Sequence, residues 1–318
     1  MTGSGVVVGV DGGGTTTDVV VADLTGDVLA SVTTGATNHE SVGVERVIEV
    51  LATGIEEALA AAGVARGDVL ISVFGLAGVD WPSDVELLGD VLAGLDLGGR
   101  RVVVNDSRVA LRAGCSQSSG IVSSVGTGSV TAGVNRSGEW FRTMAVGWGE
   151  PRGSGTLVSE ALHAIAAEHH RTAPATALTA RFLDAFGQPD VPAMFESITR
   201  GRSDGVRGRA PLVVEVAAEG DDVARAIVAT VAVRHAAMVA GVASRLGMTD
   251  ETFELVTSGG VHAGGGQFSE AFAAAVVVDC PHATIVPLTT SPALGAVALA
   301  LDELSSDSPT STGQEVSS

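Results

Sequence analysis

Two short segments rich in glycine and threonine interrupt apolar runs, and their residue types suit the binding of phosphate. Residues 9–18 read GVDGGGTTTD, and residues 126–129 read GTGS. Successive glycines let backbone N–H groups approach an anion closely, while threonine hydroxyls supply further hydrogen-bond donors. The first segment lacks the GxxxxGK[ST] pattern of a P-loop, and a strand rather than a helix follows it. Each segment is therefore either a phosphate cradle or an ordinary hairpin turn.

A candidate catalytic carboxylate follows another apolar run. Residues 100–106 read RRVVVND, and a helical pattern begins at Ser107. Asp106 thus stands at the carboxyl end of a predicted strand, where ligands of α/β sheets bind, and it could accept the proton of an attacking hydroxyl there. The alternative is that Asn105 or Asp106 only caps the helix that follows.

A third candidate segment is TSGGV at residues 257–261, between a predicted strand and a predicted helix. Its glycine pair would let a flat base or a ribose lie against the backbone. An ordinary strand–helix loop can have the same composition, so this segment alone does not identify a nucleotide site.

The elements that must position these residues form two similar sets. Apolar runs at 5–10, 18–24 and 27–34 predict a three-stranded meander, and residues 120–140 repeat its layout of strands and glycine turns. This recurrence predicts a duplicated fold. The other predicted helices are 41–62 with Ser41 as N-cap, 84–95, 107–114, 156–170, 223–247, 268–276 and 291–304, and the other predicted strands are 69–78, 100–106, 253–261 and 283–288.

Taken in order, these parts resemble the actin-like ATPase and sugar-kinase superfamily. At finer grain they resemble the N-acetylglucosamine kinase family and the related benzoyl-CoA reductase activator-type ATPases. The resemblance runs over most of residues 5–303. The segments that carry it are GVDGGGTTTD (9–18), TNHESVG (37–43), VVNDSRVAL (103–111), SSVGTGSV (123–130), VGWGE (146–150), TSGGV (257–261) and PALGAVALAL (292–301).

The resemblance implies a role for each matched segment, with Asp106 as the base that activates the sugar hydroxyl. The implied cofactors are ATP and Mg²⁺, with Asp11 and Asp18 near the metal. The implied ligands of the nucleotide are Gly13, Gly14, Thr15, Thr16, Thr127 and Gly128 for phosphate and Ser258, Gly259 and Gly260 for adenosine. The implied sugar contacts are Asn38, Asp106, Gly128, Ser129, Gly147, Trp148, Gly149 and Glu150.

The chain departs from the family at one motif. Relatives carry GWGxxxGDEGS, in which the Asp binds the sugar, whereas residues 147–155 read GWGEPRGSG. Glu150 is the nearest carboxylate and would replace that Asp, and Arg152 is unexpected at its position. The departure leaves the identity of the sugar more open than the kinase chemistry.

We therefore expect an α/β protein with two ribonuclease-H-like (actin-like ATPase) domains flanking an interdomain cleft. Residues 1–113 with 291–303 would form the first domain, residues 114–290 the second with a helical insertion, and residues 304–318 a disordered tail. The expected reaction is phosphoryl transfer from MgATP to the 6-hydroxyl of N-acetylglucosamine. The alternatives are a glucosamine or N-acetylmuramic acid kinase, a partner-activating ATPase, and a sugar sensor with a degraded site.

Composition restricts the expected partners. The 318 residues carry a formal net charge of −19 and no Lys/Arg cluster, so neither nucleic acid nor an anionic membrane is expected to bind. Cys115 and Cys280 have no metal-ligand spacing, which disfavours the iron–sulfur branch of the reductase activators. The N-terminus shows no signal-peptide pattern, so we expect a cytoplasmic protein. Because dimers are usual in the family, the resemblance implies a homodimer.

Overall fold

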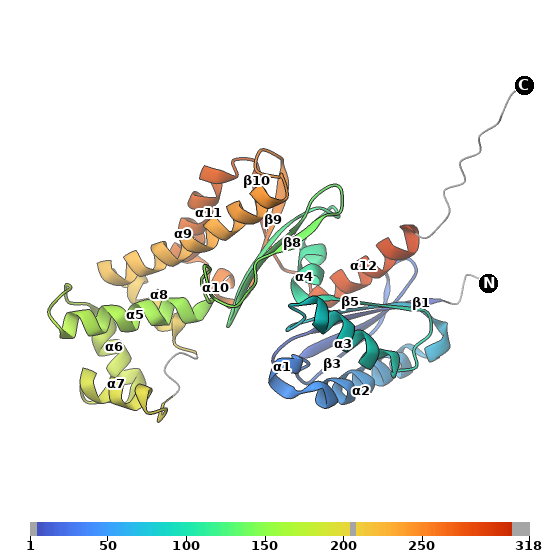
Figure 1. Ribbon diagram of the computed structural model, residues 1–318, viewed down its shortest axis with the longest axis horizontal. Helices are drawn as coiled ribbons and strands as arrows, with labels where there is room; N and C mark the ends of the chain where they lie inside the picture. The colour runs from blue at the N-terminus through green and yellow to red at the C-terminus, as the bar shows by residue number, and fades with distance from the viewer. Residues whose placement is uncertain (1–4, 204–207, 307–318) are drawn as a thin grey trace, which may run out of the picture. The chain divides into compact units, whose positions relative to one another are not determined.

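The computed structural model describes residues 5–203 and 208–306, and it divides the chain into two compact units. Unit 1 combines Met1–Gly114 with Thr289–Ser318, and unit 2 is the single segment Cys115–Leu288. Each unit contains one five-stranded mixed sheet with helices packed against it (Figure 1). This is the α/β fold of actin-like ATPases that the order of the motifs predicts.

The sheet of unit 1 is a meander extended by two parallel strands. Its strands are β1 (Val6–Gly12), β2 (Thr17–Asp23), β3 (Val28–Thr34), β4 (Val69–Leu76) and β5 (Arg100–Asn105). They lie in the order β3-β2-β1-β4-β5, in which β2 is antiparallel to β1 and β3, and β4 is parallel to β1 and β5. The carboxyl ends of β1, β4 and β5 therefore meet at one edge of the sheet.

Helices cover both faces of this sheet. Successive side chains of a strand point to opposite faces, so the apolar residues of β1 contact helices on both sides. The helices of unit 1 are α1 (His39–Val42), α2 (Val44–Ala62), the 3-10 helix η1 (Arg66–Asp68), α3 (Pro82–Ala93), α4 (Asp106–Gly114) and α12 (Pro292–Ser306). Val8 and Val10 of β1 pack with α2 and α3, whereas Val7 packs with α4 and α12. The last helix thus completes the core of the unit in which the chain begins. Residues 304–306, which the sequence assigns to a disordered tail, belong to α12, and residues 307–318 of that predicted tail lie outside the described residues.

The first helical segment of unit 1 differs from its prediction. The periodicity of residues 41–62 predicts one helix capped by Ser41, but Ser41 lies inside the short helix α1, which Asn38 caps. Gly43 separates α1 from α2 with a φ of +80°, a conformation that favours glycine. The break leaves Asn38 in the loop between β3 and α1.

Unit 2 repeats the sheet of unit 1. Its strands are β6 (Gly120–Val125), β7 (Ser129–Val134), β8 (Trp140–Arg142), β9 (Phe253–Ser258) and β10 (Ala283–Pro287). They lie in the order β10-β9-β6-β7-β8, with β6, β7 and β8 antiparallel and with β9 parallel to β6 and β10. A meander extended by two parallel strands thus occurs twice, which confirms the duplication predicted from residues 120–140.

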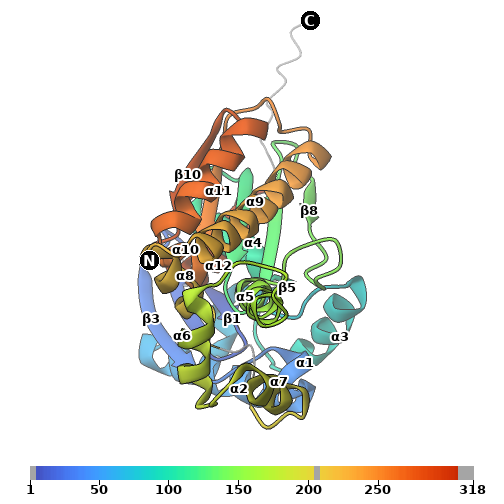
Figure 2. The same ribbon diagram turned by 90° about the vertical axis from the view of Figure 1, so that its left-hand side faces the viewer.

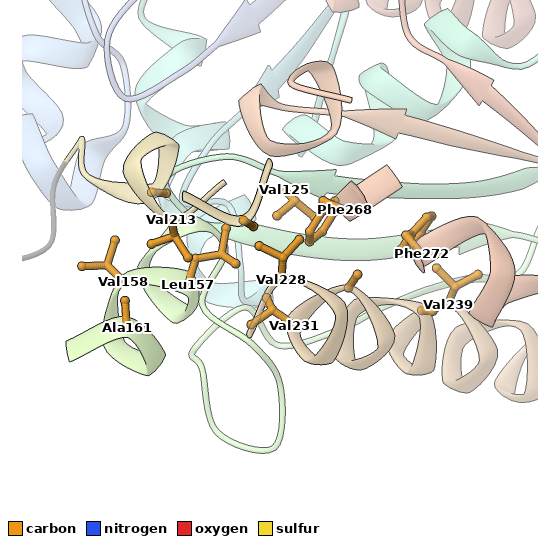
Figure 3. Close-up of a cluster of buried hydrophobic side chains, with 14 of the residues drawn as sticks. Val125, Leu157, Val158, Ala161, Val213, Val228, Val231, Val239, Phe268 and Phe272 are labelled. Atoms are coloured by element: carbon orange, nitrogen blue, oxygen red, sulfur yellow. The ribbon is translucent and has the colours of Figure 1, made fainter. Parts of the chain in front are cut away.

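The core of unit 2 lies between its sheet and its long helices. The helices are α5 (Ser154–His169), α6 (Ala177–Phe186), α7 (Val191–Thr199), α8 (Ala210–Ala218), α9 (Asp222–Arg245), α10 (Gly260–Ala263) and α11 (Gly266–Asp279). Helices α9 and α11 lie side by side in both views (Figures 1 and 2). Figure 3 shows Leu157 of α5, Val228 of α9 and Phe268 of α11 in one buried cluster with Val125 at the end of β6. Helices α6 to α8 account for the predicted helical insertion.

Helix α9 is, among the described residues, the one helix long and apolar enough to cross a membrane. Val228, Val231 and Val239 are buried in the core cluster, where α9 packs against α5, α8 and α11 (Figure 3). Its apolar composition is therefore accounted for by its place as the central core helix of unit 2.

Candidate functional site

The glycine-rich segment of unit 1 forms the turn between β1 and β2. The Gly13 N–H donates to the Thr16 carbonyl over 2.9 Å, so Gly14 and Thr15 lie at the tip, and Gly14, Thr15 and Thr16 are exposed. Gly14 does not have a positive φ, and a Cβ built there would meet no atom within 4 Å. Gly14 therefore adopts a conformation that other residues can also adopt. The space at this glycine is open to solvent and to a ligand.

Two threonine hydroxyls fix the base of this turn. Thr17 Oγ1 lies 2.8 Å from Thr37 Oγ1 in the interior, and the Thr37 N–H donates to the Gly13 carbonyl over 3.0 Å. A side chain at Gly12 would overlap the Thr37 hydroxyl. The loop that carries Asn38 is consequently held against the β1–β2 turn.

Three carboxylates influence one another at the same end of the sheet. Asp11 and Asp18 are register partners on β1 and β2, and the Thr33 hydroxyl donates to Asp18 Oδ1 over 2.6 Å. Burial, followed by the negative charges of Asp106 and Asp18, raises the pKa of Asp11 from 3.8 to about 7. The Asp106 carboxylate therefore lies close enough to the β1–β2 turn to repel a charge on Asp11.

These carboxylates fit a cation that is held mainly by a nucleotide. No group of three or more His, Cys, Asp or Glu side chains within residues 5–203 and 208–306 could hold a metal ion by itself. Mg²⁺ is usually bound through one or two carboxylates together with substrate phosphates and water. A cation beside Asp11 would also offset the repulsion that raises its pKa. Asp11 and Asp18 are therefore suited to Mg²⁺ that arrives with a polyphosphate.

Asn105, rather than Asp106, caps helix α4. The Asn105 side-chain oxygen accepts from the Ser107 N–H over 3.1 Å and from the Ser107 hydroxyl. Asp106 is the first residue of α4 and is half-buried. Because Asn105 caps α4, the Asp106 carboxylate does not serve as the N-cap of this helix.

A second loop of unit 1 is braced beside Asn105. The Asn105 amide donates to the Val79 carbonyl and to Asp80 Oδ1, each over 3.1 Å. Asp84 Oδ2 accepts from the Asp80 N–H, and Asp84 Oδ1 lies 3.5 Å from His39 Nε2. The loop after β4 is thereby tied both to Asn105 and to the loop that carries Asn38. Residues 80, 84 and 39 had no sequence signal, because nothing in their spacing marks these pairings.

Asn38 uses one end of its side chain for structure. Its oxygen accepts from the Glu40 N–H over 3.0 Å and so caps α1, while the Nδ2 group remains a potential donor to a ligand. Gly78, with a φ of +85°, packs against this amide, and a side chain at Gly78 would crowd the Asn38 oxygen. The orientation of Asn38 is therefore fixed from two sides.

The GTGS segment of unit 2 forms a matching turn between β6 and β7. The Gly126 N–H donates to the Gly128 carbonyl over 2.9 Å, and Thr127 and Gly128 are exposed. The Ser129 hydroxyl donates to the Pro151 carbonyl over 2.6 Å and accepts from the Gly153 N–H over 3.1 Å. Because its single donor is used in this way, Ser129 acts first as the tie between the GTGS turn and the loop before α5.

The loop that contains the divergent GWG motif is closed by its own glutamate. Glu150 Oε1 accepts from the backbone N–H groups of Val146 and Gly147, over 2.8 and 3.1 Å. Gly147 and Gly149 have φ values of +75° and +76°, and the Trp148 side chain between them is 78% exposed. Glu150 therefore offers one carboxylate oxygen to a ligand while the other holds the loop.

A cavity of about 630 Å³ opens beside this loop, wholly within unit 2. It lies between the loop, the first turns of α5 and the middle of α9. Its lining comprises Gly147, Gly149, Glu150, Pro151, Arg152, Gly155, Thr156, Ser159, Glu160, Arg234, Ala237 and Met238. The predicted residues Gly147, Gly149 and Glu150 thus share one wall.

The TSGGV segment turns from β9 into α10. Gly259 has a φ of +89°, and a side chain there would overlap the Val125 carbonyl at the end of β6. Ser258 is half-buried, and Gly259 and Gly260 are exposed. The close approach of two backbones explains why this position is glycine, and it holds the loop beside the GTGS turn.

A buried histidine supports this loop from below. His262 Nε2 lies 3.2 Å from Ser123 Oγ, and its ring packs edge-on against Phe272 at 4.7 Å between centroids. Burial lowers the pKa of His262 to about 4, so the ring is neutral at pH 7. Nothing in the sequence marks His262, because a single histidine without spaced partners carries no metal signal.

Comparison with known proteins identifies the family of the chain. The sequence model of the BadF/BadG/BcrA/BcrD ATPase family matches residues 8–300. The chain belongs to this family. The family match confirms the resemblance drawn from the ordered motifs. It spans the glycine-rich turn of each unit, Asp106 of unit 1 and the TSGGV segment of unit 2.

The chain is also similar to two named sugar kinases. The chain is 28% identical over 303 residues to the N-acetylmuramic acid/N-acetylglucosamine kinase of Clostridium acetobutylicum, covering 93% of this chain and 98% of that protein. It is 27% identical over 324 residues to the N-acetyl-D-glucosamine kinase of Dictyostelium discoideum, with the same coverage. The solved structure of a candidate N-acetylglucosamine kinase from Chromobacterium violaceum has a TM-score of 0.69 at 23% identity, covering 93% and 99% of the two chains, and it shows the fold.

Proposed function

We propose that the protein transfers the terminal phosphoryl group of ATP to a hydroxyl of an amino sugar, and that the 6-hydroxyl of N-acetylglucosamine is the preferred acceptor. The observation that carries the proposal is the group formed by Asp106, Asp11 and Asp18 at the end of the β1–β2 turn. Membership of an ATPase family supports the use of ATP. The names of both curated relatives support an amino-sugar acceptor.

In this proposal the two turns and the TSGGV loop hold the nucleotide. The exposed tips of the turns offer backbone N–H groups and threonine hydroxyls, which suit phosphate oxygens. The residues assigned to phosphate are Gly13, Gly14, Thr15, Thr16, Thr127 and Gly128, and those assigned to adenosine are Ser258, Gly259 and Gly260. Mg²⁺, held beside Asp11 and Asp18, would neutralise phosphate charge, because these carboxylates fit a nucleotide-bound cation.

Asp106 is proposed as the general base. Phosphoryl transfer requires little covalent work from the protein, so positioning and charge neutralisation dominate. Asp106 accepts the proton of the sugar hydroxyl as that oxygen attacks phosphorus, while Asn105 keeps the start of α4 fixed. Exclusion of water is the second requirement, because ATP hydrolysis is the competing reaction.

The residues proposed to contact the sugar are described one unit at a time. In unit 1 the Asn38 amide is oriented by its cap and by Gly78. In unit 2 the Trp148 ring is exposed, and Glu150 presents one oxygen beside Gly147 and Gly149. Ser129 and Gly128 complete the assigned sugar contacts.

The deciding experiment measures ADP release with N-acetylglucosamine, glucosamine, N-acetylmuramic acid and glucose, and locates the new phosphate by ³¹P and ¹³C NMR. We expect a preference for an amino sugar over glucose of at least about tenfold in kcat/KM, which is roughly 1.4 kcal/mol. Equal rates with all four sugars would contradict an amino-sugar kinase. ATP hydrolysis that no sugar accelerates would instead favour the partner-activating ATPase. Light scattering would test the homodimer, and cell fractionation the cytoplasmic location, both of which we also propose.

A further inference from the structure

The cavity beside the GWG loop contains a guanidinium with no carboxylate partner. The Arg152 side chain lies directly across Gly147, and a Cβ at Gly147 would overlap it. Its one described hydrogen bond runs from Nη2 to the Val146 carbonyl over 3.4 Å, and none of the described ion pairs includes Arg152. The glycine and the arginine of the divergent motif therefore fit each other, and the exposed Arg152 guanidinium remains available to a ligand in the cavity.

Of the two carboxylates that line the cavity, Glu160 is ion-paired and Glu150 is engaged through one of its oxygens only. Glu150 Oε1 closes its own loop, and Glu160 forms a 2.6 Å ion pair with Arg234 on α9. The cavity wall therefore carries one guanidinium, that of Arg152, that forms no ion pair within the described part of the chain.

The backbone on either side of Arg152 is hydrogen-bonded to Ser129 after the GTGS turn, but the Arg152 side chain is directed to the GWG loop. Its stem runs toward Gly147 and Val146, and the cavity lining includes Gly147, Gly149 and Glu150 but no residue of the GTGS turn. A volume of about 630 Å³ is within the range of small-molecule sites and can hold a sugar with a substituent. A guanidinium is well suited to a carboxylate, because its planar N–H groups can donate to both oxygens.

We propose that this cavity binds the carboxylate-bearing substituent of an acidic amino sugar, with Arg152 as the specificity-determining counter-ion. The inference rests on the proposed amino-sugar kinase function and narrows its substrate class. A probe of this chemistry is N-acetylmuramic acid, whose lactyl group carries a carboxylate, and its neutral comparison is the corresponding lactyl amide.

The test compares kcat/KM for N-acetylmuramic acid, its amide and N-acetylglucosamine, in the wild type and in Arg152→Gln, Arg152→Lys and Arg136→Gln. We expect the wild type to favour the acid over the amide by about 10- to 100-fold, the range for one charge-assisted contact. Arg152→Gln should remove most of this preference, and Arg152→Lys should retain part of it. Arg136→Gln removes the same charge from an exposed side chain outside the cavity and should leave the preference unchanged.

Several outcomes would overturn the inference. Equal use of acid and amide by the wild type would do so without any variant, so a misfolded Arg152→Gln cannot hide the answer. An equal fall in activity on every sugar, with a raised KM for ATP, would place Arg152 on the phosphate instead. If no sugar is phosphorylated, the proposed function fails, and calorimetric titration of the wild type with the acid and the amide then tests the cavity by itself. Equal affinity for the two compounds would reject the inference.

Discussion

The carboxyl groups of Asp11 and Asp106 lie at the ends of two strands of one sheet, and their surroundings suit them to different tasks. Burial, followed by the charges of Asp106 and Asp18, raises the pKa of Asp11, and a cation bound beside it would favour the ionised form again. Asp106 begins a helix that its neighbour Asn105 caps. The sequence alone left the capping residue open, because Asn and Asp are equally good N-caps. Only the position of the Asn105 amide oxygen separates the two roles.

The role of Asp106 is tested by Asp106→Asn. If Asp106 is the general base, this variant should retain its fold and its affinity for MgATP, while kcat falls by about 10²- to 10⁴-fold. Stopped assays of sugar phosphate formation measure kcat, and nucleotide titration measures binding. Turnover within a few-fold of the wild type would show that Asp106 is not the base.

The raised pKa of Asp11 predicts how the stability of the protein changes with pH. Its folded-state pKa of about 7 lies above the ordinary value of 3.8, so the folded chain binds more protons between these pH values and loses stability as the pH rises through this window. Asp11→Asn cannot ionise. The stability of this variant relative to the wild type should therefore increase by about 2 kcal/mol between pH 5 and pH 8. Urea unfolding in EDTA without nucleotide measures the difference, and a difference independent of pH would contradict the assigned environment.

Among the elements, the β1–β2 turn offers a clean test of phosphate binding. A side chain at Gly14 meets no protein atom within 4 Å, so Gly14→Val should not disturb the fold. It would occupy the space proposed for phosphate oxygens and should weaken MgATP binding by about tenfold or more, while sugar binding is largely kept. The control is Gly67→Val in η1, another exposed glycine with open surroundings. Unchanged nucleotide affinity in Gly14→Val would indicate that residues 9–18 form an ordinary hairpin turn and no phosphate site.

Helix α9 carries a second titratable group, His235. Its pKa is shifted in the direction opposite to that of Asp11, so the stability depends on pH with the opposite sign. His235 is 1% exposed, and burial followed by the neighbouring His262 lowers its pKa from 6.5 to about 4. The folded chain therefore binds fewer protons between pH 6.5 and 4, and stability is lost as the pH falls through this window. His235→Leu should gain about 2 kcal/mol relative to the wild type between pH 7.5 and pH 5. Denaturant unfolding at both pH values measures this gain, and an equal difference at the two values would contradict it.

The elements themselves were largely predictable, because apolar periodicity and glycine turns mark both meanders. The break between α1 and α2 was not, since the period of apolar residues continues across Gly43 and only its φ of +80° ends the first helix. The brace between His39 and Asp84 was also hidden, because residues so far apart in sequence leave no pattern. Long-range contacts of this kind depend on tertiary packing rather than on local composition.

At the scale of the whole molecule, unit 2 is a continuous segment with its own sheet and core. A fragment of residues 115–288 should therefore fold by itself and unfold cooperatively in urea, with an m value of about 1 to 3 kcal/mol/M. Circular dichroism during denaturation measures the transition. A gradual loss of signal without a transition would show that the core of unit 2 needs unit 1.

Helix α12 ends the described chain but belongs to the core of unit 1, where Ala293 and Ala296 pack with Val7 and Val73. The ribosome therefore delivers the first strands long before the helix that covers one of their faces. At about 5 to 20 residues per second, the ribosome needs roughly 10 to 35 seconds to translate unit 2, and during this time α12 does not yet cover that face. Unit 2, although second in the sequence, receives all of its core residues first. The nascent protein should accordingly present an apolar sheet face to chaperones until α12 leaves the exit tunnel.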